Sequence, residues 1–199
     1  MANQSINVIG IAGSLRKGSY NRGLIRAAQE LAPPNLTIEP FDLRGVPFYD
    51  GDLEERGDPP EVQALKEAIR GADALLLATP EYNAGIPAPL KNAIDWASRS
   101  PEGYRKSAIS GKTVAIIGGG GGGATRAQEQ LDQVLGVLGV DLVHPHVSVP
   151  KVWDKFDESG RLVDEPTREE IRDLLASLSA SASGTWITSC MQWRQQLVA

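Results

Sequence analysis

Short apolar runs alternate with amphipathic helical patterns along this chain, and that alternation restricts its fold more than any other feature. Between the runs, apolar residues recur at helical i, i+3, i+4 and i+7 spacing, as in Leu24, Ile25, Ala28 and Leu31. The alternation predicts βαβ units and a mostly parallel sheet. The five predicted strands are Ile6–Ala12, Leu36–Phe41, Ala74–Thr79, Thr113–Ile117 and approximately Val140–Val149.

Two prolines indicate the order of the strands, because proline cannot donate to a strand ladder and is confined to sheet edges and bulges. Pro40 falls near the end of the second run, and Pro145 interrupts the fifth. The other three runs are almost wholly apolar, as strands covered on both faces are. We therefore predict an α/β fold: a doubly wound, five-stranded parallel sheet of order 2-1-3-4-5, with helices on both faces.

Length and composition fit a single soluble domain and exclude several classes of protein. We expect one domain over residues 1–183 and a tail of uncertain structure over 184–199. The net charge of -5 argues against a nucleic-acid partner, and the apolar runs are too short to insert into a membrane. Cys190 is the only cysteine, which excludes an internal disulfide and a cysteine-rich zinc site. These features favour a cytoplasmic protein.

The loop after the first run, residues 13–21, has the composition of an anion site. It contains two glycines, two serines, an arginine, a lysine and an asparagine, and a helical pattern follows it. The first N–H groups of a helix lack internal partners and carry partial positive charge, which phosphate oxygens satisfy. Ser14 and Ser19 can donate, Arg16 can grip oxygens, and Asn21 can cap the helix or contact the ligand. An ordinary surface turn is the alternative.

A second loop, residues 80–89, follows the third run and contains three prolines and a glycine. Such a loop is stiff and loses little conformational entropy on binding. A flat ligand can lie against it and accept hydrogen bonds from its main chain. The alternative is a plain loop with prolines at the start of a helix.

A third loop contains six consecutive glycines, residues 118–123, and imitates the fingerprint of dinucleotide-binding proteins. That fingerprint belongs in the first βα turn, whereas this loop follows the fourth run. Asp141, the nearby acidic residue, lies at the start of the fifth run rather than at the end of a strand. We therefore expect this loop to form part of the site built by the first two loops, and not a separate NAD site.

Two histidines, His144 and His146, alternate onto one face of the fifth run. They could ligate a metal ion, but no third ligand of suitable type is evident nearby in the sequence. We therefore expect structural histidines and no metal site.

Two motifs resemble the NADPH-dependent FMN reductase family: GSLRKGSYN at residues 13–21 and PEYNAGIPAPLKNAIDWASR at residues 80–99. The resemblance extends from about residue 6 to 178. It implies a flavodoxin-like fold, bound FMN, and kinship with reductases of quinones, chromate and azo compounds. In this family the first loop binds the FMN phosphate, and the second follows the isoalloxazine and ribityl side. The resemblance thus implicates Ser14, Arg16, Ser19, Tyr20 and Asn21 in the first loop, Pro80, Glu81, Tyr82 and Asn83 in the second, and Gly119 and Gly120 at the rim of the ring.

The resemblance also implies an activity: hydride transfer from NADPH or NADH to FMN, then two-electron reduction of a quinone, a free flavin or a related acceptor, in a ping-pong cycle. The chemistry belongs to the cofactor, so we expect no catalytic side chain. The alternative function is a flavodoxin-like electron carrier that binds FMN but does not react with NAD(P)H. Family members are commonly homodimers or homotetramers.

Overall fold

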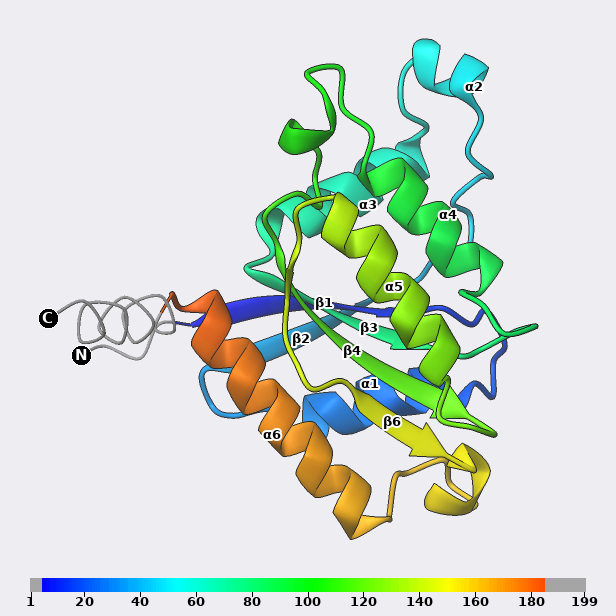
Figure 1. The fold of residues 1–199 in the computed structure, drawn as a ribbon, viewed down its shortest axis with the longest axis vertical. Coiled ribbons are helices and arrows are strands. Elements are labelled where there is room, and N and C mark those ends of the chain that lie inside the picture. The colour runs from blue at the N-terminus through cyan, green and yellow to red at the C-terminus, as the bar shows by residue number, and fades with distance from the viewer. Residues whose placement is uncertain (1–4, 185–199) are drawn as a thin grey trace, which may run out of the picture.

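The predicted doubly wound sheet is confirmed by the computed structural model, which describes residues 5–184 (Figure 1). The strands pair in the order β2-β1-β3-β4-β5, all parallel, with β6 also paired to β4. The strands are β1 (Ile6–Ala12), β2 (Leu36–Phe41), β3 (Ala74–Thr79), β4 (Thr113–Gly120), β5 (Asp141–Leu142) and β6 (Val147–Pro150). The helices are α1 (Tyr20–Leu31), α2 (Gly51–Glu55), α3 (Pro60–Gly71), α4 (Ala88–Ala97), α5 (Thr125–Val137) and α6 (Glu165–Ala182), with the short 3-10 helices η1 (Tyr104–Lys106) and η2 (Val152–Lys155).

The fifth predicted strand is two strands, and in this detail the prediction is wrong. β5 and β6 both pair with β4 but are separated by a link that contains the cis peptide bond His144–Pro145. Pro145 has no N–H for a strand ladder, so a continuous strand through it is disfavoured. The fourth strand is longer than predicted, since Gly118–Gly120 continue the ladder against β6.

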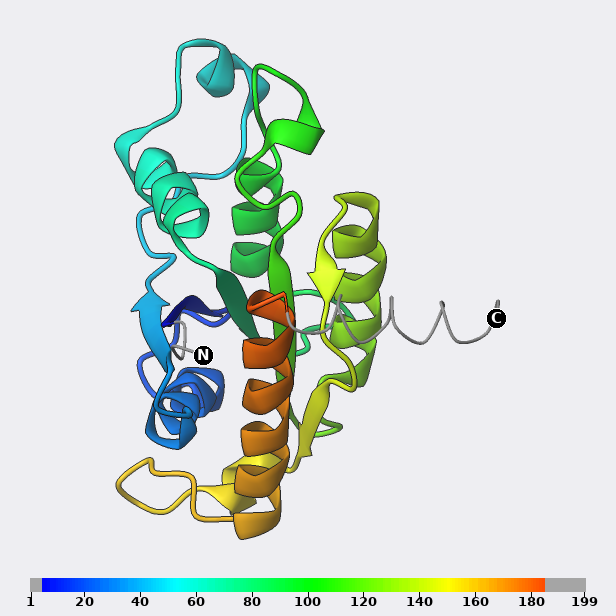
Figure 2. The same ribbon diagram turned by 90° about the vertical axis from the view of Figure 1, so that its left-hand side faces the viewer.

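Helices cover the two faces of the sheet and define two apolar clusters (Figures 1 and 2). α1 and α6 pack on one face, where Leu24 and Leu175 are fully buried. α3, α4 and α5 pack on the other, around the buried Leu65 and Trp96. The strand β3 is buried along its whole length, as its uninterrupted apolar sequence predicts.

The carboxyl ends of β1, β3 and β4 meet at one edge of the sheet, where the loops rich in glycine and proline begin. This edge includes the point where the chain reverses its winding direction, between β1 and β3. Ligands of open α/β sheets bind at such a point. No helix among residues 5–184 is long and apolar enough to cross a membrane. The predicted tail, apart from Gly184, lies outside the described residues.

The first turn of helix α6 is capped by a single carboxylate, that of Asp164, and this cap gives a test of what stabilises the fold. Asp164 accepts hydrogen bonds from Thr167 N at 3.1 Å, Thr167 Oγ1 at 2.6 Å and Lys155 Nζ at 2.8 Å. The bond from Lys155 is the main cause that lowers the pKa of Asp164, and the bonds from Thr167 add to it.

We predict that Asp164→Ala lowers the free energy of unfolding by about 1 kcal/mol at neutral pH, which is a typical value for an N-cap. A lowered folded-state pKa contributes stability above the unfolded-state pKa, and this stability is lost as the pH falls through the folded-state value. The deficit of the variant should therefore shrink in acid. Urea unfolding at several pH values measures it, with Glu169→Ala on the same helix as the control. A deficit that does not change with pH would contradict this account.

Candidate flavin site

The three loops predicted from the sequence surround one cavity of about 260 Å³. It lies at the carboxyl ends of β1, β3 and β4, so residues far apart in the sequence meet there. Every predicted site residue except Asn83 lines it, and Val152 and Trp153 complete the wall. The lining residues are Ser14, Arg16, Ser19, Tyr20, Asn21, Pro80, Glu81, Tyr82, Gly119, Gly120, Val152 and Trp153.

The first loop presents the amino end of α1 to this cavity. Ser19 is the N-cap residue, and its Oγ accepts a hydrogen bond from Arg22 N at 3.4 Å. The first turn of α1 contains no acidic residue, so nothing there offsets the positive end of the helix dipole. Ser14 and Ser19 are buried, while Arg16 is exposed at the mouth of the cavity. The protein is acidic overall, but this corner is suited to an anion.

Asn21 fixes the amino end of α1 to the glycine loop. Its Nδ2 donates to Gly119 O at 3.0 Å, and its Oδ1 accepts from Gly119 N at 3.1 Å. This reciprocal pair is buried and joins α1 to the end of β4. The helix cap is Ser19, so of the two roles expected for Asn21, capping is excluded. The side chain still lines the cavity.

The glycines of the third loop have two different roles. A Cβ at Gly118 would meet the side chain of Gln128 and the main chain of Gly123, and a Cβ at Gly119 would lie 2.9 Å from Leu24 Cδ1. These two positions are closed by packing. A Cβ at Gly120 would meet only Ala124 N, at 3.9 Å, and one at Gly122 would meet nothing within 4 Å. At its start, the loop therefore allows α1 and α5 to pack closely against its main chain. At Gly120 and Gly122 the space around the loop is open.

The second loop forms a tight turn beside the cavity. Tyr82 and Gly85 exchange main-chain hydrogen bonds, and the two residues between them, Asn83 and Ala84, have φ values of 50° and 61°. Positive φ at both central positions is typical of a type I′ turn. Asn83 is exposed at the tip of this turn and does not line the cavity. Tyr82 Oη donates to Ser14 Oγ at 3.4 Å, so the turn contacts the first loop.

Glu81 lines the cavity but has a structural partner. Its Oε2 accepts a hydrogen bond from Arg126 N, in the first turn of α5, at 3.0 Å. The N-cap residue of α5 is Ala124, which has no side chain able to cap the helix. Glu81 therefore caps α5 from a distant loop, and the negative charge suits the positive end of that helix.

Sequence reasoning missed Val152 and Trp153, which lie in η2 just after β6. Trp153 is half exposed, which is unusual for so large an apolar side chain. The available signal was positional: the loop after the fifth strand also leaves the sheet at the carboxyl edge, where the other three loops gather.

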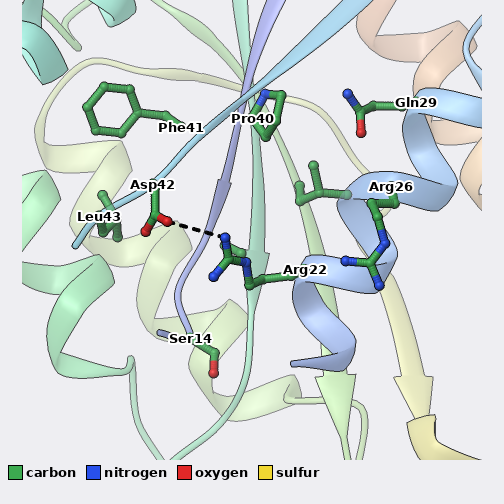
Figure 3. A pocket seen from close by; sticks show the side chains of 11 residues that line it. Ser14, Arg22, Arg26, Gln29, Pro40, Phe41, Asp42 and Leu43 are labelled. Carbon is green, nitrogen blue, oxygen red and sulfur yellow. Dashed lines mark hydrogen bonds and ion pairs between the residues drawn. The ribbon is translucent and has the colours of Figure 1, made fainter. Parts of the chain in front are cut away.

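A second cavity, of about 440 Å³, lies between α1 and β2 and shares Ser14 with the first (Figure 3). Arg22 and Asp42 form an ion pair across it at 3.3 Å. A hydrogen bond from Arg44 N lowers the pKa of Asp42, and the charges of Arg22 and Arg44 add to this effect. Because the Arg22 side chain already pairs with a carboxylate, this cavity is less suited to a phosphate than the amino end of α1.

Sequence reasoning also missed a third potential ligand beside the two histidines. Asp132 of α5 lies beside His144 and His146, and one ligand atom from each residue falls within 4.8 Å of the others. The apolar periodicity of the sequence places Asp132 on a helix. It does not show which strand or loop the Asp132 side of that helix contacts.

We predict that Gly119→Ala destabilises the protein by about 1–3 kcal/mol, since the added methyl group must displace Leu24, Val152 or Asn21. Gly122→Ala, in the same loop, has open space around its Cβ and should change stability by less than about 0.5 kcal/mol. Chemical denaturation of the two variants measures the difference. Equal stabilities would show that the start of the loop is not closely packed.

Comparisons with known proteins agree with this geometry. Residues 6–154 match the family described as NADPH-dependent FMN reductase. An NAD(P)H-dependent FMN reductase of Pseudomonas aeruginosa is 47% identical over 176 residues, covering 87% of this chain and 93% of the relative. An NAD(P)H:quinone oxidoreductase of Solanum tuberosum is 42% identical over 188 residues, covering 89% of this chain and 93% of the relative. The solved structure of a flavoenzyme NAD(P)H:(acceptor) oxidoreductase from Paracoccus denitrificans superposes with a TM-score of 0.80 at 31% identity, covering 90% of this chain and 98% of that one. The chain therefore belongs to the NADPH-dependent FMN reductase family.

Proposed function

We propose that this chain is an FMN-dependent NAD(P)H oxidoreductase that reduces quinones, free flavin or related two-electron acceptors. The observation that carries the proposal is the convergence of three loops on one cavity, whose lining includes both the amino end of α1 and the main chain of Gly119 and Gly120. Membership of the family and the names of the relatives support the same activity.

The residues around the cavity fit the two chemically different ends of FMN. The amino end of α1, with the buried hydroxyls of Ser14 and Ser19 and the guanidinium of Arg16, suits the phosphate. At the other end, the open space above Gly120 and the half-exposed rings of Tyr82 and Trp153 suit a flat, partly apolar ring. We propose that these residues, together with Tyr20, Asn21, Pro80, Glu81, Asn83 and Gly119, form the FMN site.

Bound FMN supplies the hydride chemistry, accepting two electrons from NAD(P)H and passing them on. The chain's own contribution is to bind and orient. Glu81, the one carboxylate in the lining, is engaged with the first turn of α5 and is not needed as an acid or base. The main-chain N–H groups of Tyr82 and Gly85 pair within the turn, so fixed donors that stabilise negative charge on the ring would come from other N–H groups of the second loop.

We propose further that the protein acts in the cytoplasm as a homodimer or homotetramer. Exposed apolar side chains in the cavity lining and next to it in the sequence support a second subunit there: Tyr82 and Trp153 of the lining are 53% and 50% exposed, and Leu15, between the lining residues Ser14 and Arg16, is 41% exposed. A patch of this kind is typical of a protein interface. Sedimentation analysis tests this point, and a monomer mass at micromolar concentration would contradict it.

An electron carrier with the same fold is the second candidate, and reaction with the nicotinamide cofactor separates the two. We predict that NADPH or NADH, added without oxygen to the FMN-loaded protein alone, removes the visible absorbance of oxidised flavin. A quinone added afterwards should restore it. A carrier would stay oxidised until a partner reductase was supplied. Initial rates with both nucleotides and with quinones, FMN, chromate and azo dyes then define the preferred substrates.

A pair of neighbouring cations tests the phosphate end of the site. We predict that Arg16→Ala weakens FMN binding by about 1–3 kcal/mol, the cost of losing a charge-assisted hydrogen bond. Lys17→Ala removes the same charge from a side chain that does not line the cavity, and it should have a much smaller effect. The Arg16 effect should largely disappear when riboflavin, which lacks the phosphate, replaces FMN. Fluorescence titration measures the affinities of the unmutated protein and both variants for each flavin, and equal losses for the two flavins in Arg16→Ala would exclude Arg16 as a phosphate ligand.

A further inference from the structure

We propose that Asp132, His144 and His146 bind a divalent transition-metal ion of the zinc type, at a site separate from the flavin cavity. Two imidazoles and one carboxylate form a ligand set that suits zinc, whereas magnesium and calcium prefer oxygen ligands alone. None of the three residues lines the flavin cavity. The proposal is independent of the proposed oxidoreductase activity.

The three side chains come from two elements that the fold brings together. Asp132 lies on α5, whereas His144 and His146 lie in the link between β5 and β6. Asp132 Oδ1 is 2.6 Å from His146 Nε2, and the two imidazole rings are 4.5 Å apart between centroids. One ligand atom from each side chain lies within 4.8 Å of the other two.

These separations need only small adjustments to form a metal centre. Zinc bonds of about 2.0–2.1 Å in a tetrahedral arrangement place neighbouring ligand atoms about 3.3 Å apart. The Asp132–His146 contact must lengthen slightly, and His144 must turn inward. Both moves are open, because His144 is exposed and the Asp132 side chain is 35% exposed. The His146 side chain is only 11% exposed and provides the fixed ligand.

The surroundings of His146 also favour a cation. Glu170 and Asp173 line a neighbouring cavity of about 400 Å³ together with His146, and both carry negative charge toward it.

A bound ion would join α5 to the β5–β6 link. α5 begins directly after the glycine loop, and β6 leads into Val152 and Trp153, so the two elements adjoin neighbouring parts of the flavin cavity wall. Gln128 already connects them through a hydrogen bond to Ser148 Oγ at 3.0 Å. The metal would be a second, structural connection farther from the cavity, with its remaining coordination position open to water or an external ligand.

The test uses FMN-loaded protein without an affinity tag, in a Cys190→Ser background so that the single thiol cannot supply a ligand. Titration with zinc chloride against a chromogenic chelator at pH 7.5 should give one ion per chain. His144→Ala and Asp132→Asn should each weaken that affinity about tenfold or more. Asp141→Asn is the control, since it removes the same charge from the adjacent, exposed end of β5.

The zinc affinities of the four proteins distinguish a metal site at these residues from nonspecific binding. Loss of zinc affinity in His144→Ala and Asp132→Asn, but not in Asp141→Asn, supports the site. Equal binding by all four proteins, no binding by the starting protein, or displacement of zinc by excess magnesium would overturn it. Circular dichroism and thermal unfolding check that each variant is folded, which the exposure of His144 and the partial exposure of Asp132 favour. The flavin spectrum and NADPH reaction report on the proposed function separately.

Discussion

The close approach of α1 to the end of β4 is the contact on which the site depends. It requires a residue without a side chain at Gly119, whose main chain exchanges two hydrogen bonds with Asn21. This approach places the amino end of α1, where we propose that the phosphate binds, beside the open part of the glycine loop. A residue with a Cβ at position 119 would separate them.

Of the two helices that begin at the site, one is capped by a residue of its own loop and the other by a residue of a different loop. The second kind of cap connects the loops to one another. Ser19 caps α1 within the first loop, whereas α5 takes its cap from Glu81 of the second loop. Tyr82 then contacts Ser14 of the first loop. Each loop is therefore held by another loop as well as by its own strand. Such preorganisation suits a protein whose cofactor performs the chemistry, because orientation is what the chain contributes.

Much of this arrangement was predictable, because it follows from local rules. Pro40 and Pro145 indicated the edge strands, and the composition of the first loop indicated an anion site at the switch point. What the sequence could not show were contacts that depend on the tertiary fold. Glu81 caps α5 because Ala124 offers no local cap. Trp153 reaches the cavity because of the turn after β6. Asp132 lies beside the histidines because of the side of α5 on which it falls.

We propose that the phosphate of FMN binds at the amino end of α1 and not in the larger cavity beside it. A crystal structure of the FMN complex measures this directly. We expect the phosphate oxygens within hydrogen-bond distance of Arg16 and of the main chain between Ser14 and Ser19, with the ring along Gly119 and Gly120. A phosphate bound instead between Arg22 and Arg26 would contradict the account.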